Sequence, residues 1–365
     1  MKTLYLHIGA HRTGTTYLQT CLHRNRDALV DHGIDPLADF SVWGQGHHNV
    51  AFSYLGWALR DVCWSREEFL KRFRNRIRDS KLTSIVISSE FFELFDDSAV
   101  GRLRSDLAGY RKVVIYWVRN QAQYLESYYR ESFKQGLTEP FDSWMNQRVA
   151  AGMGDFHAVA RRWVAGLDAD AIHIVIYENL LRENCNIFGY FADRILGVPI
   201  SALEFPVEAI INPSADGRFL WLLREMNLRY GRSESHVAGI GTQYLRMRRR
   251  LEHIFYSNPS FASGAGPAQI IDASVAHDIA ARFEASNARL VADFGGAICN
   301  PTSDATLFPA TNFNSVDAHI GIESGRTATP MLLELLFRAL TDVGETPESS
   351  ATPAQTPPNG FSGPD

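Results

Sequence analysis

Residues 2–16 read K-T-L-Y-L-H-I-G-A-H-R-T-G-T-T, and this stretch decides the fold. Residues 2–8 predict a short strand, residues 9–16 form a turn with two glycines, and the spacing from Leu18 to Leu29 predicts a helix. A strand, a glycine-bearing turn and a helix point several backbone N–H groups, and the positive end of a helix dipole, at one spot. The sequence therefore predicts an anion site at this turn, with a phosphate as the expected anion.

The turn differs from the common nucleotide loop in its cation. That loop reads G-x-x-x-x-G-K-[ST], and its lysine reaches the β and γ phosphates. Gly9 and Gly14 have the matching separation, but Thr15 stands at the lysine position and Arg12 is the only cation of the loop. A loop without that lysine is poorly suited to a triphosphate with magnesium, which disfavours a P-loop kinase or NTPase. An ordinary strand-to-helix turn capped by Gly and Thr stays open as the simplest alternative.

A second constellation follows the most strand-like stretch of the chain. Residues 112–118, K-V-V-I-Y-W-V, predict a buried strand; Arg119 closes it, and a helix is predicted over residues 121–135. Ser127 lies on that predicted helix. A guanidinium and a hydroxyl together are suited to a dianionic phosphate.

The strings H-I-G-A-H-R-T-G-T-T and V-R-N-Q-A-Q-Y-L-E-S resemble the 5′-phosphosulfate loop and the 3′-phosphate motif of sulfotransferases, in a form similar to the bacterial, carbohydrate-type branch. The resemblance covers residues 3–30 and 112–135, with weaker echoes at Glu90 and residues 177–180. It implies 3′-phosphoadenosine 5′-phosphosulfate (PAPS) as donor, 3′-phosphoadenosine 5′-phosphate (PAP) as product, no metal, and a hydroxyl acceptor on a small molecule or glycan. The implied donor-binding residues are Gly9, Arg12, Thr13, Gly14, Thr15, Thr16, Arg119 and Ser127.

The resemblance also implies catalytic roles. Arg12 stands where the family usually carries lysine, and would stabilise charge on the leaving 5′-phosphate. Arginine supplies charge but is a poor proton donor, so an acid role for the loop cation is in doubt. The acceptor hydroxyl must lose a proton. Glu90, in S-S-E-F-F after a predicted strand, resembles the catalytic glutamate of glycan sulfotransferases, and His47 and His48 are the alternative bases.

Four predicted strands, at residues 2–8, 84–89, 112–118 and 173–177, are separated by segments with helical spacing. This order predicts an α/β fold with a doubly wound, mainly parallel sheet and helices on both faces. Ligands of such sheets bind beyond the carboxyl ends of the strands. The predicted division is as follows: residues 1–300, a single sulfotransferase domain, helical from about 219; residues 301–344, a weakly ordered extension with a helix over 331–343; residues 345–365, a disordered tail rich in Pro, Ser, Thr and Gly.

Composition limits the function classes. The chain has 365 residues, of which 45% are hydrophobic, and a net charge of −5, which argues against a general nucleic-acid binder. Four scattered cysteines without a C-x-x-C pair predict a reduced compartment. The sequence shows no signal peptide and no run of 18 apolar residues, so we expect a cytoplasmic protein without a membrane anchor.

Two questions stay open at this level. The four arginines within residues 246–250 either contact an acidic substrate or form a solvated helix face. A non-catalytic nucleotide-binding protein of the same fold is the third functional hypothesis. The acceptor cannot be named, because fold and donor loop do not determine it.

Overall fold

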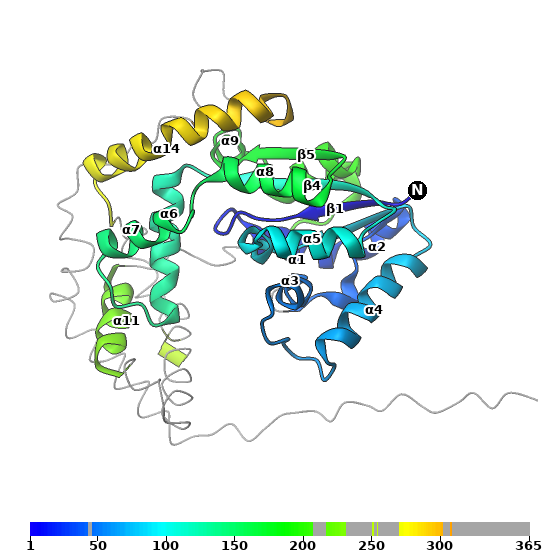
Figure 1. Ribbon diagram of the computed structural model, residues 1–365, viewed down its shortest axis with the longest axis horizontal. Coiled ribbons are helices and arrows are strands. Elements are labelled where there is room, and N and C mark those ends of the chain that lie inside the picture. The colour runs from blue at the N-terminus through cyan, green and yellow to red at the C-terminus, as the bar shows by residue number, and fades with distance from the viewer. Residues whose placement is uncertain are drawn as a thin grey trace, which may run out of the picture.

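The computed structural model describes residues 1–42, 46–206, 217–230, 250–251, 254, 270–301 and 307–308. These residues form an α/β fold around one five-stranded sheet in which every pair of neighbouring strands is parallel (Figure 1). The strand order is β2-β3-β1-β4-β5. The strands are β1 (Thr3–His7), β2 (Ile34–Asp35), β3 (Ser84–Ser88), β4 (Arg111–Val118) and β5 (Ala171–Ile176). The predicted parallel α/β sheet is thus confirmed.

The first strand of the chain is the middle strand of the sheet. Thr3 of β1 is in register with Ser84 of β3 on one side and with Arg111 of β4 on the other. All residues of β4 after Arg111 are buried, as expected for a β-branched, apolar strand covered on both faces. The carboxyl ends of β1, β3 and β4 therefore meet at one edge.

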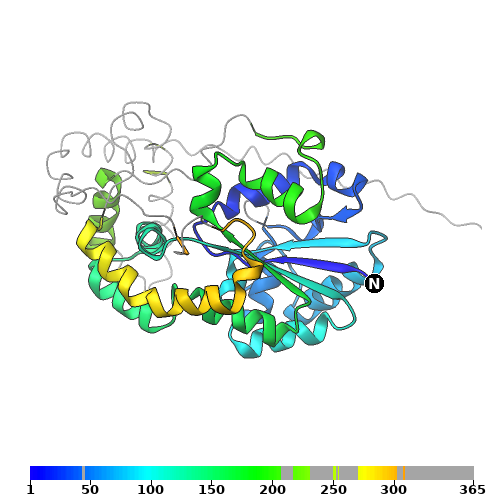
Figure 2. The ribbon, with the colours of Figure 1, turned by 90° about the horizontal axis from the view of Figure 1, so that it is seen from above.

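Helices cover both faces of the sheet (Figure 2). One apolar core joins one face of the sheet to helices α3, α4, α5 and α8, and a second core joins the other face to α1, α2, α9 and α10. Alternate residues of β4 enter the two cores: Val114 and Tyr116 the first, Ile115 and Trp117 the second. The bounds are α1 (Thr15–Arg24), α2 (Arg26–Asp31), α3 (His48–Leu55), α4 (Arg66–Asp79), α5 (Asp97–Asp106), α8 (Phe156–Leu167), α9 (Tyr177–Arg182) and α10 (Ile187–Tyr190).

Further helices lie beyond the carboxyl edge of the sheet. Of these, α6, α7 and α11 lie next to one another at the side of the molecule opposite the N-terminus (Figure 1). The further helices are α6 (Gln121–Ser132), α7 (Phe141–Ala150), α11 (Gly217–Tyr230) and α14 (Ala273–Phe294). Asn227 of α11 donates to the carbonyls of Phe133 and Leu137 at 2.8 and 2.9 Å, which ties α11 to the end of α6. The single-turn elements are η1 (Ala38–Phe40), η2 (Glu90–Leu94), η3 (Phe133–Gln135), η4 (Phe191–Leu196), η5 (Ile200–Ala202) and η7 (Gly295–Ala297).

Several predicted bounds differ from the structure. The sequence of residues 33–46 predicts a loop, but β2 lies within it. The spacing of residues 49–60 predicts a helix up to Arg60, but α3 ends at Leu55, where Gly56 adopts a positive φ of 77°. β5 ends at Ile176, and Tyr177 begins α9. Of the C-terminal predictions, α11 and α14 are helices, whereas most of residues 244–255, the helix at 331–343 and the tail at 345–365 lie outside the described residues.

The described residues contain neither a membrane-spanning helix nor a cluster of metal-ligating side chains. None of their helices is long and apolar enough to cross a lipid bilayer. Their His, Cys, Asp and Glu side chains form no group of three that could hold a metal ion.

Candidate functional site

The loop after β1 is built as an extension of the sheet. Ala10 donates its N–H to the carbonyl of Trp117 at 2.6 Å, and Trp117 donates to the carbonyl of Gly9 at 2.7 Å. Thr13, fully buried, donates its hydroxyl to the Ala10 carbonyl at 2.6 Å. Gly9 has a φ of 101°, and a Cβ at this position would lie 3.3 Å from the Cα of Glu90. The loop backbone therefore lies directly against Glu90.

The N-terminus of α1 leaves backbone donors free. Gly14 is its N-cap, with a left-handed φ of 79°, and no side chain caps the helix. Within the described part of the chain, the amides of Thr15, Thr16 and Tyr17 have no hydrogen-bond acceptor. Free amides at a helix start carry partial positive charge, and they bind anions. The predicted anion site is thus available.

Three of the predicted donor-binding residues come together here. The Nε of Arg12 donates to the Oγ of Ser127 at 3.0 Å, and the Nη1 of Arg119 donates to the carbonyl of Arg12 at 2.7 Å. Arg12 has a φ of 63°, a region that residues other than glycine rarely adopt and that often accompanies a binding site. The structure therefore places the loop, the end of β4 and α6 around one position.

Arg119 is a partly buried cation whose Nε has an unfilled hydrogen-bonding position. Its Nε is buried and has no hydrogen-bond partner in the described structure; the nearest carboxylate oxygen, Oε1 of Glu178, is 3.8 Å away. Its guanidinium lies 5.2 Å from the centre of the Tyr177 ring. Burial lowers the pKa of Arg119, and Tyr177 and Glu178 act in the opposite direction. A buried N–H group without a protein acceptor can donate to an oxygen of water or of a ligand.

α6 adds charged residues that the sequence analysis did not single out. Glu131 accepts from the Nη1 of Arg12 at 3.1 Å. Arg130 lies near both Arg12 and Arg119, whose charges help to lower its pKa after the larger effect of burial, while Glu126 raises it. Arg130 follows Ser127 by three residues, a spacing that places both on one helix face, so the signal was present in the sequence.

Glu90 lies on the other side of the loop, at the end of β3. Its Oε2 accepts from the Nε2 of Gln19 at 2.8 Å and is 3.9 Å from the Nδ1 of His48. Burial would raise the pKa of Glu90, but His48, His11 and the Gln19 hydrogen bond outweigh burial and lower it. Glu90 is therefore a carboxylate at neutral pH.

The two adjacent histidines have different environments. Both ring nitrogens of His47 contact the backbone: the Ser88 N–H donates to Nδ1 at 3.0 Å, and Nε2 is 3.0 Å from the carbonyl of Pro36. Burial lowers the pKa of His47 to about 4. His48 contacts the Oγ of Ser89 at 3.0 Å, and burial lowers its pKa as well. His48 thus lies beside Glu90, while the His47 ring is committed to the backbone.

A buried carboxylate in η2 was not recognised in the sequence. Oε2 of Glu93 accepts from the backbone N–H of His11 at 3.0 Å and lies 2.9 Å from the Nδ1 of the same residue. Tyr116 and Tyr124 donate their hydroxyls to Glu93 at 3.2 and 3.3 Å. Only the fold joins these residues, and no spacing in the sequence indicates the pairing.

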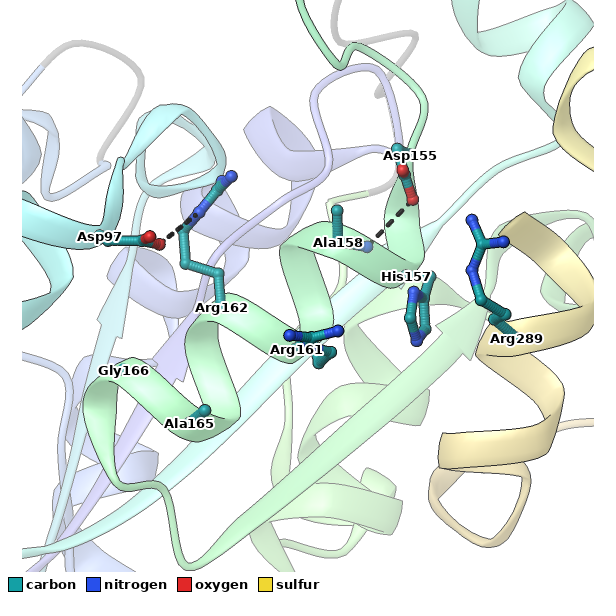
Figure 3. A pocket seen from close by; sticks show the side chains of 9 residues that line it. All are labelled: Asp97, Asp155, His157, Ala158, Arg161, Arg162, Ala165, Gly166 and Arg289. Carbon is teal, nitrogen blue, oxygen red and sulfur yellow. Dashed lines mark hydrogen bonds and ion pairs between the residues drawn. The ribbon is translucent and has the colours of Figure 1, made fainter. Parts of the chain in front are cut away.

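A separate groove of about 630 Å³ lies along α8 (Figure 3). Arg162 contacts Asp97 across it at 3.1 Å, and Arg161 and Arg289 also line it. None of the loop residues lines this groove, so it is distinct from the candidate site.

Comparison with known proteins gave no match: no family model, curated protein or solved structure is similar to this chain.

Proposed function

We propose that this chain is a PAPS-dependent sulfotransferase that transfers a sulfuryl group to an acceptor hydroxyl, with carbohydrates as the first acceptor class to test. One observation carries the proposal: Arg12, in the loop that leads into the free amides of α1, contacts Arg119 and Ser127, which lie 107 and 115 residues further along the chain. This arrangement offers two neighbouring anion sites. PAPS carries two anionic groups, a 5′-phosphosulfate and a 3′-phosphate.

The residues divide between these two groups. The amides of Thr15 and Thr16, with the loop from Gly9 to Gly14, would hold the 5′-phosphosulfate. Arg119 and Ser127 would hold the 3′-phosphate, and the unfilled Nε of Arg119 supports this assignment. Arg12 lies between the two groups and would supply charge to both. Arginines of this kind could neutralise the donor without a metal ion.

The acceptor hydroxyl would be activated at the end of β3. Sulfuryl transfer resembles phosphoryl transfer, a loose in-line displacement governed by positioning and charge. Glu90 is ionised and can accept the hydroxyl proton. His48 is the alternative base, since burial favours its neutral form. His47 is a weaker alternative, because both its nitrogens contact backbone groups.

Two measurements test the function. Calorimetry should show that PAP binds more tightly than ATP with magnesium; tighter binding of ATP would instead favour a kinase or NTPase. Incubation with labelled PAPS and a panel of hydroxyl acceptors should then transfer the label. Tight binding of PAP without transfer to any acceptor would favour a non-catalytic nucleotide-binding protein.

A further inference from the structure

His11 is the residue next to Arg12 in the loop, and it is held more firmly than its position in a loop suggests. Oε2 of Glu93 contacts both its backbone N–H and its ring Nδ1. The imidazole packs between Phe91 and Tyr128, with ring centres 5.3 and 5.5 Å away. Its Nε2 has no hydrogen-bond partner in the described part of the chain, and the side chain is 14% exposed. One nitrogen is thus fixed on a carboxylate, and the other is available to a ligand.

A carboxylate bound to Nδ1–H fixes the tautomer of a histidine and stabilises its protonated form. Glu90 adds a second negative charge, because it interacts electrostatically with His11. The titratable groups around the ring are Glu90 and Glu93 from η2, His48 from α3 and Tyr128 from α6.

The other basic side chains nearby are less suited to giving up a proton. The Nε and Nη1 of Arg12 are bound to Ser127 and Glu131 on α6, and a guanidinium does not release its proton in proteins. Both nitrogens of His47 contact the backbone. Burial lowers the pKa of His48, so its ring is neutral at pH 7.

We propose that His11, positioned by Glu93, is the general acid that protonates the leaving 5′-phosphate. This inference rests on the proposed function. The acceptor oxygen forms its bond to sulfur as the bond from sulfur to the bridging oxygen breaks. The bridging oxygen keeps the electron pair and takes the Nε2 proton of His11, while the acceptor proton goes to Glu90. The proton on Glu90 then restores the imidazolium, and the released proton leaves with the 5′-phosphate.

The first experiment replaces His11 with glutamine, whose amide can still donate to Glu93. Turnover should fall about 10²–10⁴-fold, the usual contribution of a general acid, while the Kd for PAP stays unchanged. The alkaline limb of the pH–rate profile, where the acid loses its proton, should disappear. His157→Gln is the matched control, because His157 also contacts a carboxylate, Asp293, at 2.7 Å, and lies outside the site.

The second experiment replaces Glu93 with glutamine and observes the His11 ring by NMR spectroscopy. In NMR spectra of the full chain with PAP bound, the ring nitrogen shifts of His11 should change in Glu93→Gln, because Nδ1 loses its carboxylate partner, and those of His157 should not change. Turnover should fall, with the Kd for PAP unchanged. Glu93→Asp should restore part of the wild-type behaviour in both measurements.

The outcomes separate the two proposals. Wild-type protein that fails to bind PAP would overturn the proposed function, and this inference with it. PAP binding and turnover in the wild type, with normal turnover or an unchanged alkaline limb in His11→Gln, would overturn the acid role alone. Loss of PAP binding in His11→Gln would make His11 a donor ligand and would also overturn the acid role. Ring nitrogen shifts of His11 that are unaffected by Glu93→Gln would overturn the positioning role of Glu93.

Discussion

Replacing Arg119 with glutamine removes the charge assigned to the 3′-phosphate. In the structure the Nε of Arg119 is buried and has no hydrogen-bond partner in the described residues, and the Nη1 donates to the carbonyl of Arg12 at 2.7 Å. Loss of a charge-assisted contact costs about 1.5–3 kcal/mol. At about 1.4 kcal/mol for each factor of ten, we expect PAP to bind about 10- to 150-fold more weakly.

The assay is calorimetry with two ligands that differ only in the 3′-phosphate, PAP and adenosine 5′-monophosphate. Arg119→Gln should weaken PAP and leave adenosine 5′-monophosphate unchanged. Arg119→Lys, which keeps the charge but loses the planar fork, should give an intermediate loss. Arg161→Gln is the control, because Arg161 lies in the separate groove along α8.

Equal weakening of both ligands would refute the assignment. It would show that Arg119 holds the loop conformation through its hydrogen bond to the Arg12 carbonyl and does not bind the 3′-phosphate. A thermal melt of each variant checks the fold, because Arg119→Gln also removes the nearest cation from the buried carboxylate of Glu178. Burial already raises the pKa of Glu178, so this carboxylate can take up a proton when the arginine is lost.

Three further predictions follow from the same geometry. Glu90→Gln should lower turnover about 10²–10⁴-fold with the Kd for PAP unchanged; normal turnover in Glu90→Gln and its loss in His48→Asn would move the base to His48. Gly14→Ala should weaken PAP binding, because alanine strains the left-handed φ of 79° at the N-cap that precedes the free amides of α1, and its Cβ would also displace the Cδ1 of Ile187. Gly33→Ala is the control, because Gly33 has the same φ of 79° but a Cβ there would meet no neighbouring atom. This variant should lose a similar free energy of unfolding through backbone strain, and its affinity for PAP should stay unchanged. Burial lowers the pKa of His7 and His47 from 6.5 to about 4, so the unfolded chain binds more protons between these values. The free energy of unfolding should therefore fall as the pH drops below about 6.5, by on the order of 2 kcal/mol per ring at pH 5, with little change above pH 7 in denaturant titrations.

The sequence was sufficient where a signal is local. The β-branched run of β4 predicted a buried strand, and Ser65 with Glu68 forms a capping box at the start of α4, where a helix was expected. α8 was missed although its signal is readable: Asp155 caps it, and Phe156, Val159 and Trp163 follow the helical spacing.

Elements held by distant partners could not be predicted. β2 has only two residues, and Asp35 is fixed by hydrogen bonds from Arg76 at 2.7 and 3.0 Å and from Ser80 at 2.6 Å. Nothing in the sequence around Asp35 indicates those partners. A strand this short is specified by tertiary contacts and leaves no periodic pattern.

The candidate site also contains residues that a sequence motif indicated and one residue that no sequence pattern indicated. Two motifs indicated Arg12 on the one hand and Arg119 with Ser127 on the other as donor-binding residues, and hydrogen bonds join the three in the structure. Glu93 carries no such signal: its contacts with His11, Tyr116 and Tyr124 depend on how η2 packs against the loop and β4. A sequence pattern reports the spacing of residues along one element, whereas the Glu93 carboxylate contacts residues of three elements, the loop, β4 and α6.

The central position of β1 has a consequence for biosynthesis. Residues 3–7 are synthesised before both of their partner segments, residues 84–88 and residues 111–115. Until β4 has been made, an apolar strand with unpaired backbone groups on both sides is exposed to other nascent chains. Closure of these long loops is slow, and it must precede formation of the loop at Gly9, whose carbonyl accepts from Trp117. Nascent fragments that stop before Arg119 lack this residue, which is assigned to the proposed donor, so we expect that they do not bind PAP in calorimetry.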